Sequence, residues 1–218
     1  MAVIIMAGMI SVGKSTMTEI LADELGTTPF YEPVEENPIL AEYYKEPKRY
    51  GFDLQIYFLN KRFRMIKKAL SDNNNILDRS IFEDLLFTEE NYESGNMIKA
   101  EFDIYKDLLD NMMSEINSQA KSRPDLLVFL DSDFETILHR IKKRNRPFEQ
   151  IDNNPELKDY YFRIWSKYRQ WYNDYDISPK VKIDLGKHDV SKPKEKDYVV
   201  KLIKDKIKNM WITNRKRR

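Results

Sequence analysis

Gly8-Met9-Ile10-Ser11-Val12-Gly13-Lys14-Ser15 is the stretch that decides the fold, since it follows an apolar run at residues 2–7 and opens a helical pattern at residues 14–25. Its spacing, G-x-x-x-x-G-K-S, is that of a phosphate-binding loop: the glycines fold the backbone around a polyphosphate, the lysine reaches the phosphate oxygens and the hydroxyl contacts Mg²⁺. A glycine-rich turn between a strand and a helix is the alternative, but it leaves the Lys-Ser pair unexplained. We therefore predict that this loop, together with Thr16, binds a nucleoside triphosphate at the start of a helix.

The composition excludes several classes of partner. Lys and Arg number 37 against 36 Asp and Glu, so no overall positive charge favours a nucleic-acid polymer or an anionic membrane. The chain has no cysteine, which excludes disulfides, thiolate metal sites and cysteine nucleophiles and is typical of a reducing compartment. The apolar run at residues 2–7 is too short for a signal peptide or a membrane span. We expect a cytoplasmic protein with no membrane partner.

Apolar runs alternate with helical spacing along the chain. Strands are predicted at residues 2–7, 29–31, 76–80, 126–130 and 180–184. Helices are predicted at residues 14–25, 37–45, 52–70, 81–87, 100–120, 134–144, 157–175 and 196–211, with a break at Pro47 and a polar connection at residues 89–96. This alternation favours an α/β fold of three layers, in which a five-stranded parallel sheet has helices on both faces. We expect one domain over residues 1–212 and a disordered basic tail over residues 213–218.

Charged residues follow two of the predicted strands. Glu32 comes after residues 29–31, and Asp78-Arg79 lies at the end of the run 76–80. Ligands of open α/β sheets bind beyond the carboxyl ends of the strands, although acids at strand ends also cap helices. Phosphoryl transfer requires a base or an orienting acid, Mg²⁺, and cations that stabilise the developing charge. The candidates are Glu32 as the base, Ser15 and Asp78 as magnesium ligands, and Lys14 and Arg79 as charge stabilisers.

A basic segment follows the fourth predicted strand. Residues 140–146 carry five cations in seven positions, and Pro147 ends the run. A basic helix end that leads into a loop predicts a phosphate lid at about residues 140–150, with Arg140, Arg144 and Arg146 on the triphosphate. The alternative is a basic helix end that only complements the helix dipole.

Several motifs together resemble the deoxyribonucleoside kinase family, and most nearly its bacterial deoxyadenosine/deoxyguanosine kinases. They are the loop Gly8-x4-Gly13-Lys14-Ser15, Tyr31-Glu32-Pro33-Val34-Glu35, Tyr43-Tyr44-Lys45-Glu46-Pro47, Leu54-Gln55, Asp78-Arg79-Ser80, the lid from Arg140 to Glu149, and Asp176-Ile177-Ser178-Pro179-Lys180. The resemblance covers most of the chain. It implies a P-loop kinase fold with a short lid, and ATP- and Mg²⁺-dependent phosphorylation of a deoxynucleoside 5′-hydroxyl.

The resemblance also implies roles for individual residues. Glu32 would take the proton of the 5′-hydroxyl, and Arg79 would hold that carboxylate and the transferred phosphoryl group. Tyr44 and Glu149 match the pair that hydrogen-bonds the sugar 3′-hydroxyl. Gln55 matches the amide that reads the base edge, since an amide is both donor and acceptor.

The base end of the implied site holds a further pair of charges. Arg62 and Asp84 match the ion pair of family members that accept purines or deoxycytidine rather than thymidine. A salt bridge between two helices is the alternative interpretation. Phe58 is assigned to the same substrate side, whereas Leu54 stands where relatives often have a stacking phenylalanine, so that Phe87 or a neighbouring residue remains as the stacking aromatic.

The leading hypothesis is an ATP-dependent 5′-kinase of purine deoxynucleosides, with deoxyadenosine favoured and deoxyguanosine or deoxycytidine also possible. Two rivals remain: a thymidylate or nucleoside monophosphate kinase, and a P-loop ATPase or nucleotide-switch module. The resemblance implies a homodimer or a heterodimer with a sister kinase subunit. Aromatic side chains at residues 160–172 are expected to form core or a dimer face.

Overall fold

The computed structural model describes residues 2–34, 36–72, 74–152 and 154–216. Its centre is one sheet in the order β2-β3-β1-β4-β5, and every neighbouring pair of strands is parallel. The strands are β1 Val3–Gly8, β2 Thr28–Phe30, β3 Asn75–Asp78, β4 Leu126–Asp131 and β5 Lys180–Asp184. All residues of β1 and β4 are buried, as expected of parallel strands that are covered on both faces. The predicted five-stranded parallel sheet is therefore confirmed.

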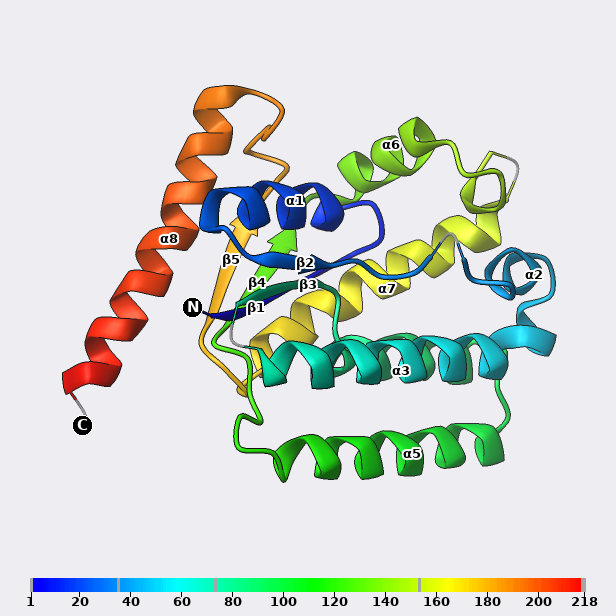
Figure 1. The fold of residues 1–218 in the computed structure, drawn as a ribbon. Helices are drawn as coiled ribbons and strands as arrows, with labels where there is room; N and C mark the ends of the chain where they lie inside the picture. Colours follow the sequence, from blue (N-terminus) through cyan, green and yellow to red (C-terminus); the bar gives the residue numbers. More distant parts are fainter. Residues whose placement is uncertain (1, 35, 73, 153, 217–218) are drawn as a thin grey trace.

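Helices cover both faces of the sheet and complete three layers (Figure 1). They are α1 Lys14–Leu25, α2 Leu40–Lys45, α3 Pro47–Ser71, α4 Asp84–Glu93, α5 Lys99–Asn117, α6 Phe134–Arg144, α7 Pro155–Asp174 and α8 Pro193–Lys216, with 3₁₀ turns η1 Ile81–Glu83 and η2 Pro147–Glu149. Figure 1 shows α1 on one side of the sheet, α3 and α7 on the other, and α5 outside α3. Among the described residues, no helix combines the length and apolar character needed to cross a membrane.

Two helix boundaries differ from the sequence prediction. The preceding helix α2 ends at Lys45, before Pro47, as predicted, but α3 starts at Pro47 rather than at residue 52. A proline in the first helical turn lacks only an N–H that would have no helical partner. The polar connection predicted at residues 89–96 is wrong, since α4 continues to Glu93. Glu90 is fully buried on α4 and pairs with Arg163 and Lys167 of α7, so its polarity marks a helix interface rather than a loop.

The last helix is also longer than predicted. It runs over Pro193–Lys216, and thus includes part of the segment 213–218 that the sequence suggested to be disordered. Arg217 and Arg218, the rest of that basic tail, lie outside the described residues. The domain boundary at residue 212 therefore stays a prediction.

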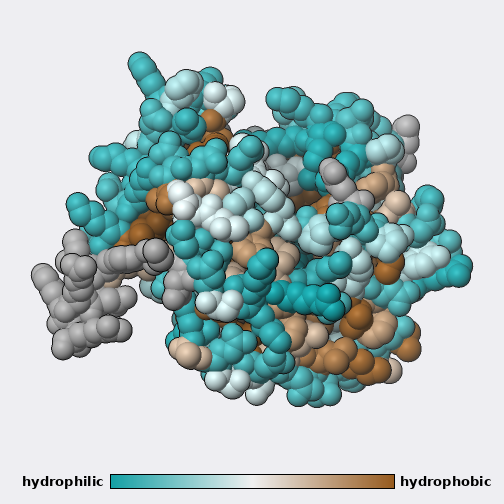
Figure 2. Space-filling view, in the orientation of Figure 1, coloured by the Kyte–Doolittle hydropathy of each residue, from teal (hydrophilic) through white to brown (hydrophobic). Residues whose placement is uncertain are grey.

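The face of the molecule shown in Figure 2 is mostly hydrophilic. The exposed large apolar side chains include Ile98, Ile104 and Leu108, which are 66%, 53% and 37% exposed. They belong to α5 and to the residue that precedes it. This helix thus leaves apolar area in contact with solvent.

The first glycine of the phosphate-binding loop is required by packing as well as by conformation. Gly8 has φ of 144°, and a Cβ atom placed there would lie 2.4 Å from the carbonyl oxygen of Leu130 on the neighbouring strand β4. Gly95 also has a positive φ, 69°, but a Cβ atom added there would meet no described atom within 4 Å. A substitution at Gly95 therefore tests the cost of backbone conformation alone, whereas a substitution at Gly8 adds the cost of a steric clash.

We predict that Gly8→Ala lowers the free energy of unfolding by about 2 kcal/mol or more, because it adds a clash with a backbone atom to an unfavourable φ. Gly95→Ala, the matched control, should cost about 1 kcal/mol from backbone conformation alone. Urea unfolding measures both. Equal losses would contradict a packing role for Gly8.

Candidate active site

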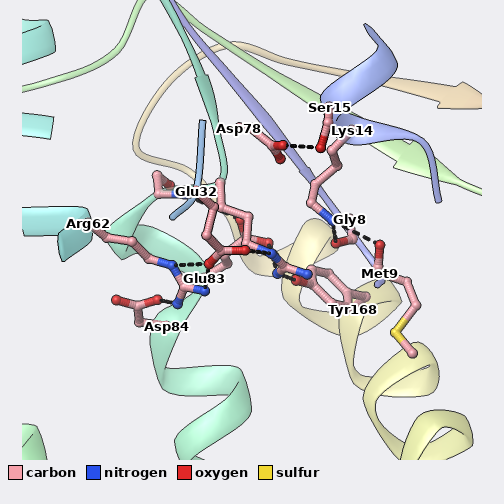
Figure 3. A network of polar contacts seen from close by, with 12 residues as sticks. Gly8, Met9, Lys14, Ser15, Glu32, Arg62, Asp78, Glu83, Asp84 and Tyr168 are labelled. Atoms are coloured by element: carbon pink, nitrogen blue, oxygen red, sulfur yellow. Dashed lines mark hydrogen bonds and ion pairs between the residues drawn. The ribbon is translucent and has the colours of Figure 1, made fainter. Parts of the chain in front are cut away.

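The phosphate-binding loop lies at the carboxyl end of β1, where Lys14 folds back over it. The Lys14 Nζ donates hydrogen bonds to the carbonyl oxygens of Gly8 and Met9, both at 3.0 Å (Figure 3). Burial and the nearby Arg79 guanidinium lower the pKa of Lys14 to about 7. A polyphosphate in the loop would favour the charged ammonium form by direct attraction.

Ser15 and Asp78 meet beside this loop, as the sequence predicted for a magnesium site. The Ser15 hydroxyl donates to Asp78 Oδ2 at 2.5 Å, whereas Asp78 Oδ1 is buried and has no hydrogen-bond partner among the described residues. Mg²⁺ prefers oxygen ligands and usually takes one or two from the protein, with phosphates and water supplying the rest. The described residues contain no cluster of three or more His, Cys, Asp or Glu that could hold a metal on its own. The donor set fits a magnesium ion shared with a polyphosphate.

Glu32 lies just beyond β2, and both of its carboxylate oxygens face arginines. Oε1 accepts a hydrogen bond from Arg62 Nε at 3.0 Å, and Oε2 pairs with Arg79 Nε at 3.1 Å. Burial disfavours the carboxylate, but the two guanidinium groups outweigh it and lower the pKa of Glu32. The sequence predicted the contact with Arg79 and did not predict the one with Arg62. An ionised Glu32 can accept a proton.

Two residues that the sequence did not single out hold the Arg79 side chain. Its Nη1 donates to the Tyr168 hydroxyl at 2.5 Å and lies 3.4 Å from Glu83 Oε2, while Tyr168 donates to the same Glu83 oxygen at 2.6 Å. Its guanidinium also lies over the Phe87 ring, 4.9 Å from the centroid. Glu83 lies four residues after Arg79, but Arg79 precedes the 3₁₀ turn η1, so the i,i+4 rule for helices does not predict this ion pair. No local signal links Tyr168 to this site.

A cavity of about 540 Å³ collects most of the predicted site residues. Those that line it are Lys14, Ser15, Glu32, Tyr44, Gln55, Phe58, Arg62, Asp78, Arg79, Arg144, Arg146 and Glu149. Ile10 and Ser11 of the loop also line it, as do Leu54 and Phe87. Residues far apart in the sequence thus share one cavity that begins at the phosphate-binding loop.

Tyr44 and Glu149 come together from α2 and from η2. The Tyr44 ring packs on Phe148 with centroids 5.3 Å apart. Burial, Tyr161 and the Glu149 carboxylate raise the pKa of the Tyr44 hydroxyl well above its ordinary value, so this group remains a hydrogen-bond donor. Glu149 is 3% exposed and pairs with Arg144 and Arg146 of the lid.

Arg62 and Asp84 form the predicted ion pair. Arg62 Nη1 pairs with Asp84 Oδ1, and both residues are buried. Arg62 also lies 4.8 Å from the centroid of the Phe58 ring. Asp84 does not line the cavity and contributes to it only through its ion pair with Arg62. Gln55 lies in the cavity wall. The cavity wall therefore includes hydrogen-bonding groups of Arg62 and Gln55 as well as the apolar ring of Phe58.

The three lid arginines do not act as one group. Arg144 and Arg146 line the cavity. Arg140 does not: its Nη1 donates to the carbonyl oxygen of Val12 and its Nη2 to that of Leu185. Two of the three predicted arginines thus line the cavity, whereas the third donates hydrogen bonds to backbone carbonyl oxygens.

Comparison with known proteins supports the interpretation of this cavity as a kinase site. A sequence model of the family described as deoxynucleoside kinase matches residues 4–208. A deoxyguanosine kinase of Lactobacillus johnsonii is 49% identical over 96% of this chain and 94% of its own length. A deoxyadenosine kinase of Lactobacillus acidophilus is 45% identical over 95% of this chain and 97% of its own length.

Solved structures agree with these relatives. The structure of a deoxyadenosine kinase from M. mycoides with bound dATP superposes with a TM-score of 0.77 and 32% identity, covering 95% of this chain and 100% of that one. The same kinase with dCMP and dCDP bound gives a TM-score of 0.76. The loop, the arginine-bound carboxylate and the buried ion pair thus occur in a chain whose relatives are deoxyguanosine and deoxyadenosine kinases, and the chain belongs to the deoxynucleoside kinase family.

Proposed function

We propose that this deoxynucleoside kinase transfers the γ-phosphoryl group of ATP to the 5′-hydroxyl of purine deoxyribonucleosides, with deoxyadenosine preferred. The observation that carries the proposal is the buried Arg62–Asp84 ion pair, whose arginine lines the same cavity as Gln55. A guanidinium held by a carboxylate presents directed donors and acceptors, which favour adenine, guanine or cytosine over thymine. Relatives named deoxyguanosine kinase and deoxyadenosine kinase match this chain almost equally well, which supports a purine substrate but not one base over the other.

In the proposed reaction, Glu32 accepts the proton of the 5′-hydroxyl while the 5′-oxygen forms a bond to the γ-phosphorus and the bond to the ADP oxygen breaks. Arg79 touches Glu32 and lies one residue after Asp78, so it stabilises both the carboxylate and the charge on the transferred group. Lys14, Arg144 and Arg146 add positive charge around the phosphates.

The donor of this family is of the ATP type, and we propose Mg²⁺ as its partner. Ser15 and Asp78 would hold the ion through the Ser15 hydroxyl and the buried, unpartnered Oδ1 of Asp78. When bound, the ion neutralises charge on the phosphate oxygens.

The sugar and the base would be held by side chains of α2, α3 and the lid. Tyr44 and Glu149 are placed to hydrogen-bond the 3′-hydroxyl, since both line the cavity and their polar groups interact. Gln55 would read the base edge with its amide, and Phe58 would pack near the base. Phe87, which also lines the cavity, is the side chain that would stack on the base.

Three further properties stay predictions. The single domain would span residues 1–212, with the lid at about residues 140–150. The protein would act in the cytoplasm in deoxynucleotide salvage. It would form a homodimer, or a heterodimer with a sister subunit; burial of the exposed apolar side chains of α5 in the dimer would favour that assembly.

The four natural deoxynucleosides test the substrate class directly. With ATP and Mg²⁺, we expect phosphorylation of deoxyadenosine first, deoxyguanosine and deoxycytidine next, and thymidine least. Turnover on deoxynucleoside monophosphates alone would instead indicate a monophosphate kinase. Turnover without any acceptor would indicate an ATPase or switch module.

Glu32→Gln tests the base. The amide keeps the shape of the side chain but cannot accept the proton, so kcat should fall by about 10²-fold or more. The affinity for ADP, measured by calorimetry, should stay close to that of the native protein because Glu32 does not belong to the phosphate-binding loop. Native turnover in a folded Glu32→Gln variant would exclude Glu32 from the role of base.

A further inference from the structure

Arg140 is the lid arginine that the cavity leaves unexplained. It lies on the second turn of α6, half-buried, four residues before Arg144. Its Nη1 donates to the Val12 carbonyl oxygen at 2.7 Å and its Nη2 to the Leu185 carbonyl oxygen at 2.8 Å. A guanidinium is planar and fixes both of its bonds at once, so it sets the distance between the two carbonyls.

The Val12 carbonyl belongs to a peptide unit of the phosphate-binding loop. In a trans peptide the C=O and the following N–H point in opposite directions, so a donor that holds the Val12 oxygen also aims the Gly13 N–H. No described residue accepts a hydrogen bond from Gly13 N. In a loop of this spacing, such free N–H groups are the ones that bind phosphate. A charged donor on the carbonyl also polarises the peptide and strengthens its N–H as a donor.

The loop around this peptide has an unusual backbone conformation. Gly13 has φ of 112°, and Ser11 also has a positive φ, 60°. The second anchor, Leu185, is itself fixed: its N–H donates to the carbonyl oxygen of Asp131 at 2.8 Å, and its side chain would lie 3.2 Å from a Cβ atom added at Gly13. Arg140 therefore ties the loop to the rigid end of the sheet.

We propose that Arg140 is a positioning residue of the phosphate-binding loop: through the Val12 carbonyl it aims the Gly13 N–H at the donor phosphates, and it does not contact the transferred phosphoryl group. Arg144 and Arg146, which line the cavity, supply the positive charge instead. The inference rests on the proposed function only in so far as this loop binds the phosphate donor.

Two substitutions separate positioning from charge. Arg140→Met removes the donors but keeps an unbranched stem, and Arg140→Lys keeps the charge but cannot hold two carbonyls as a planar fork. Lys143→Met, an exposed cation on the same helix, is the control for loss of one charge. The probes are ADP and inorganic tripolyphosphate, each with Mg²⁺, measured by calorimetry. Circular dichroism verifies that each variant is folded.

We expect Arg140→Met to lower the affinity for ADP and the affinity for tripolyphosphate by the same factor, about 10- to 100-fold. This factor corresponds to the contribution of hydrogen bonds made by a charged group. Arg140→Lys should bind both probes nearly as weakly as Arg140→Met does, and Lys143→Met should bind both probes like the native protein. In the free protein, the amide NMR signal of Gly13 should shift in both Arg140 variants and stay in place in Lys143→Met.

Three results would overturn the proposal. Native affinity in Arg140→Lys would mean that charge alone matters and that Arg140 contacts phosphate directly. A loss of affinity for ADP but not for tripolyphosphate would mean that Arg140 contacts the nucleoside part of ADP. An unmoved Gly13 signal would mean that the peptide does not depend on Arg140. None of these measurements needs an acceptor, so their outcome is independent of which deoxynucleoside, if any, the protein phosphorylates.

Discussion

One carboxylate buried between two guanidinium groups is the interaction on which the rest of the site depends. Glu32 is paired through one oxygen with Arg62 and through the other with Arg79. Each arginine has a second carboxylate, Asp84 for Arg62 and Glu83 for Arg79. Loss of one partner from a buried pair costs about 3–5 kcal/mol, because it leaves a charge without compensation. The five side chains therefore favour one common arrangement.

The order of the strands makes this arrangement possible. β2 pairs with β3, which brings Glu32 at the end of one strand beside Asp78 and Arg79 at the end of the other. β3 in turn pairs with β1, which leads into the phosphate-binding loop. The same edge of the sheet therefore brings together the phosphate-binding loop, Ser15 and Asp78, and Glu32, while α3 and α4 contribute the Arg62–Asp84 ion pair. The proposed phosphoryl transfer would take place at this edge.

The sequence predicted the features that follow from local patterns. The loop Gly8 to Ser15 and the charged residues at strand ends follow from local spacing, and the structure brings them to one cavity. The Arg62–Asp84 pair follows from the family resemblance, and the structure contains it. The contact between Arg79 and Tyr168 could not be predicted, since 89 residues separate them and only the packing of α7 against α4 joins them. The position of Arg140 was missed for a similar reason: a basic helix end predicts charge near phosphate, but it does not reveal which carbonyl a guanidinium reaches.

A carbon-13 NMR titration of the Glu32 side-chain carboxyl tests whether this carboxylate is paired with both arginines. Because Arg62 and Arg79 lower its pKa in the folded state, the pair stabilises the fold above the pKa of an unfolded glutamate, and this contribution is lost as the pH falls through the folded value. We expect Glu32 to titrate below the ordinary value of about 4.3. A Glu32 pKa above that value, as burial without paired arginines would give, would contradict it.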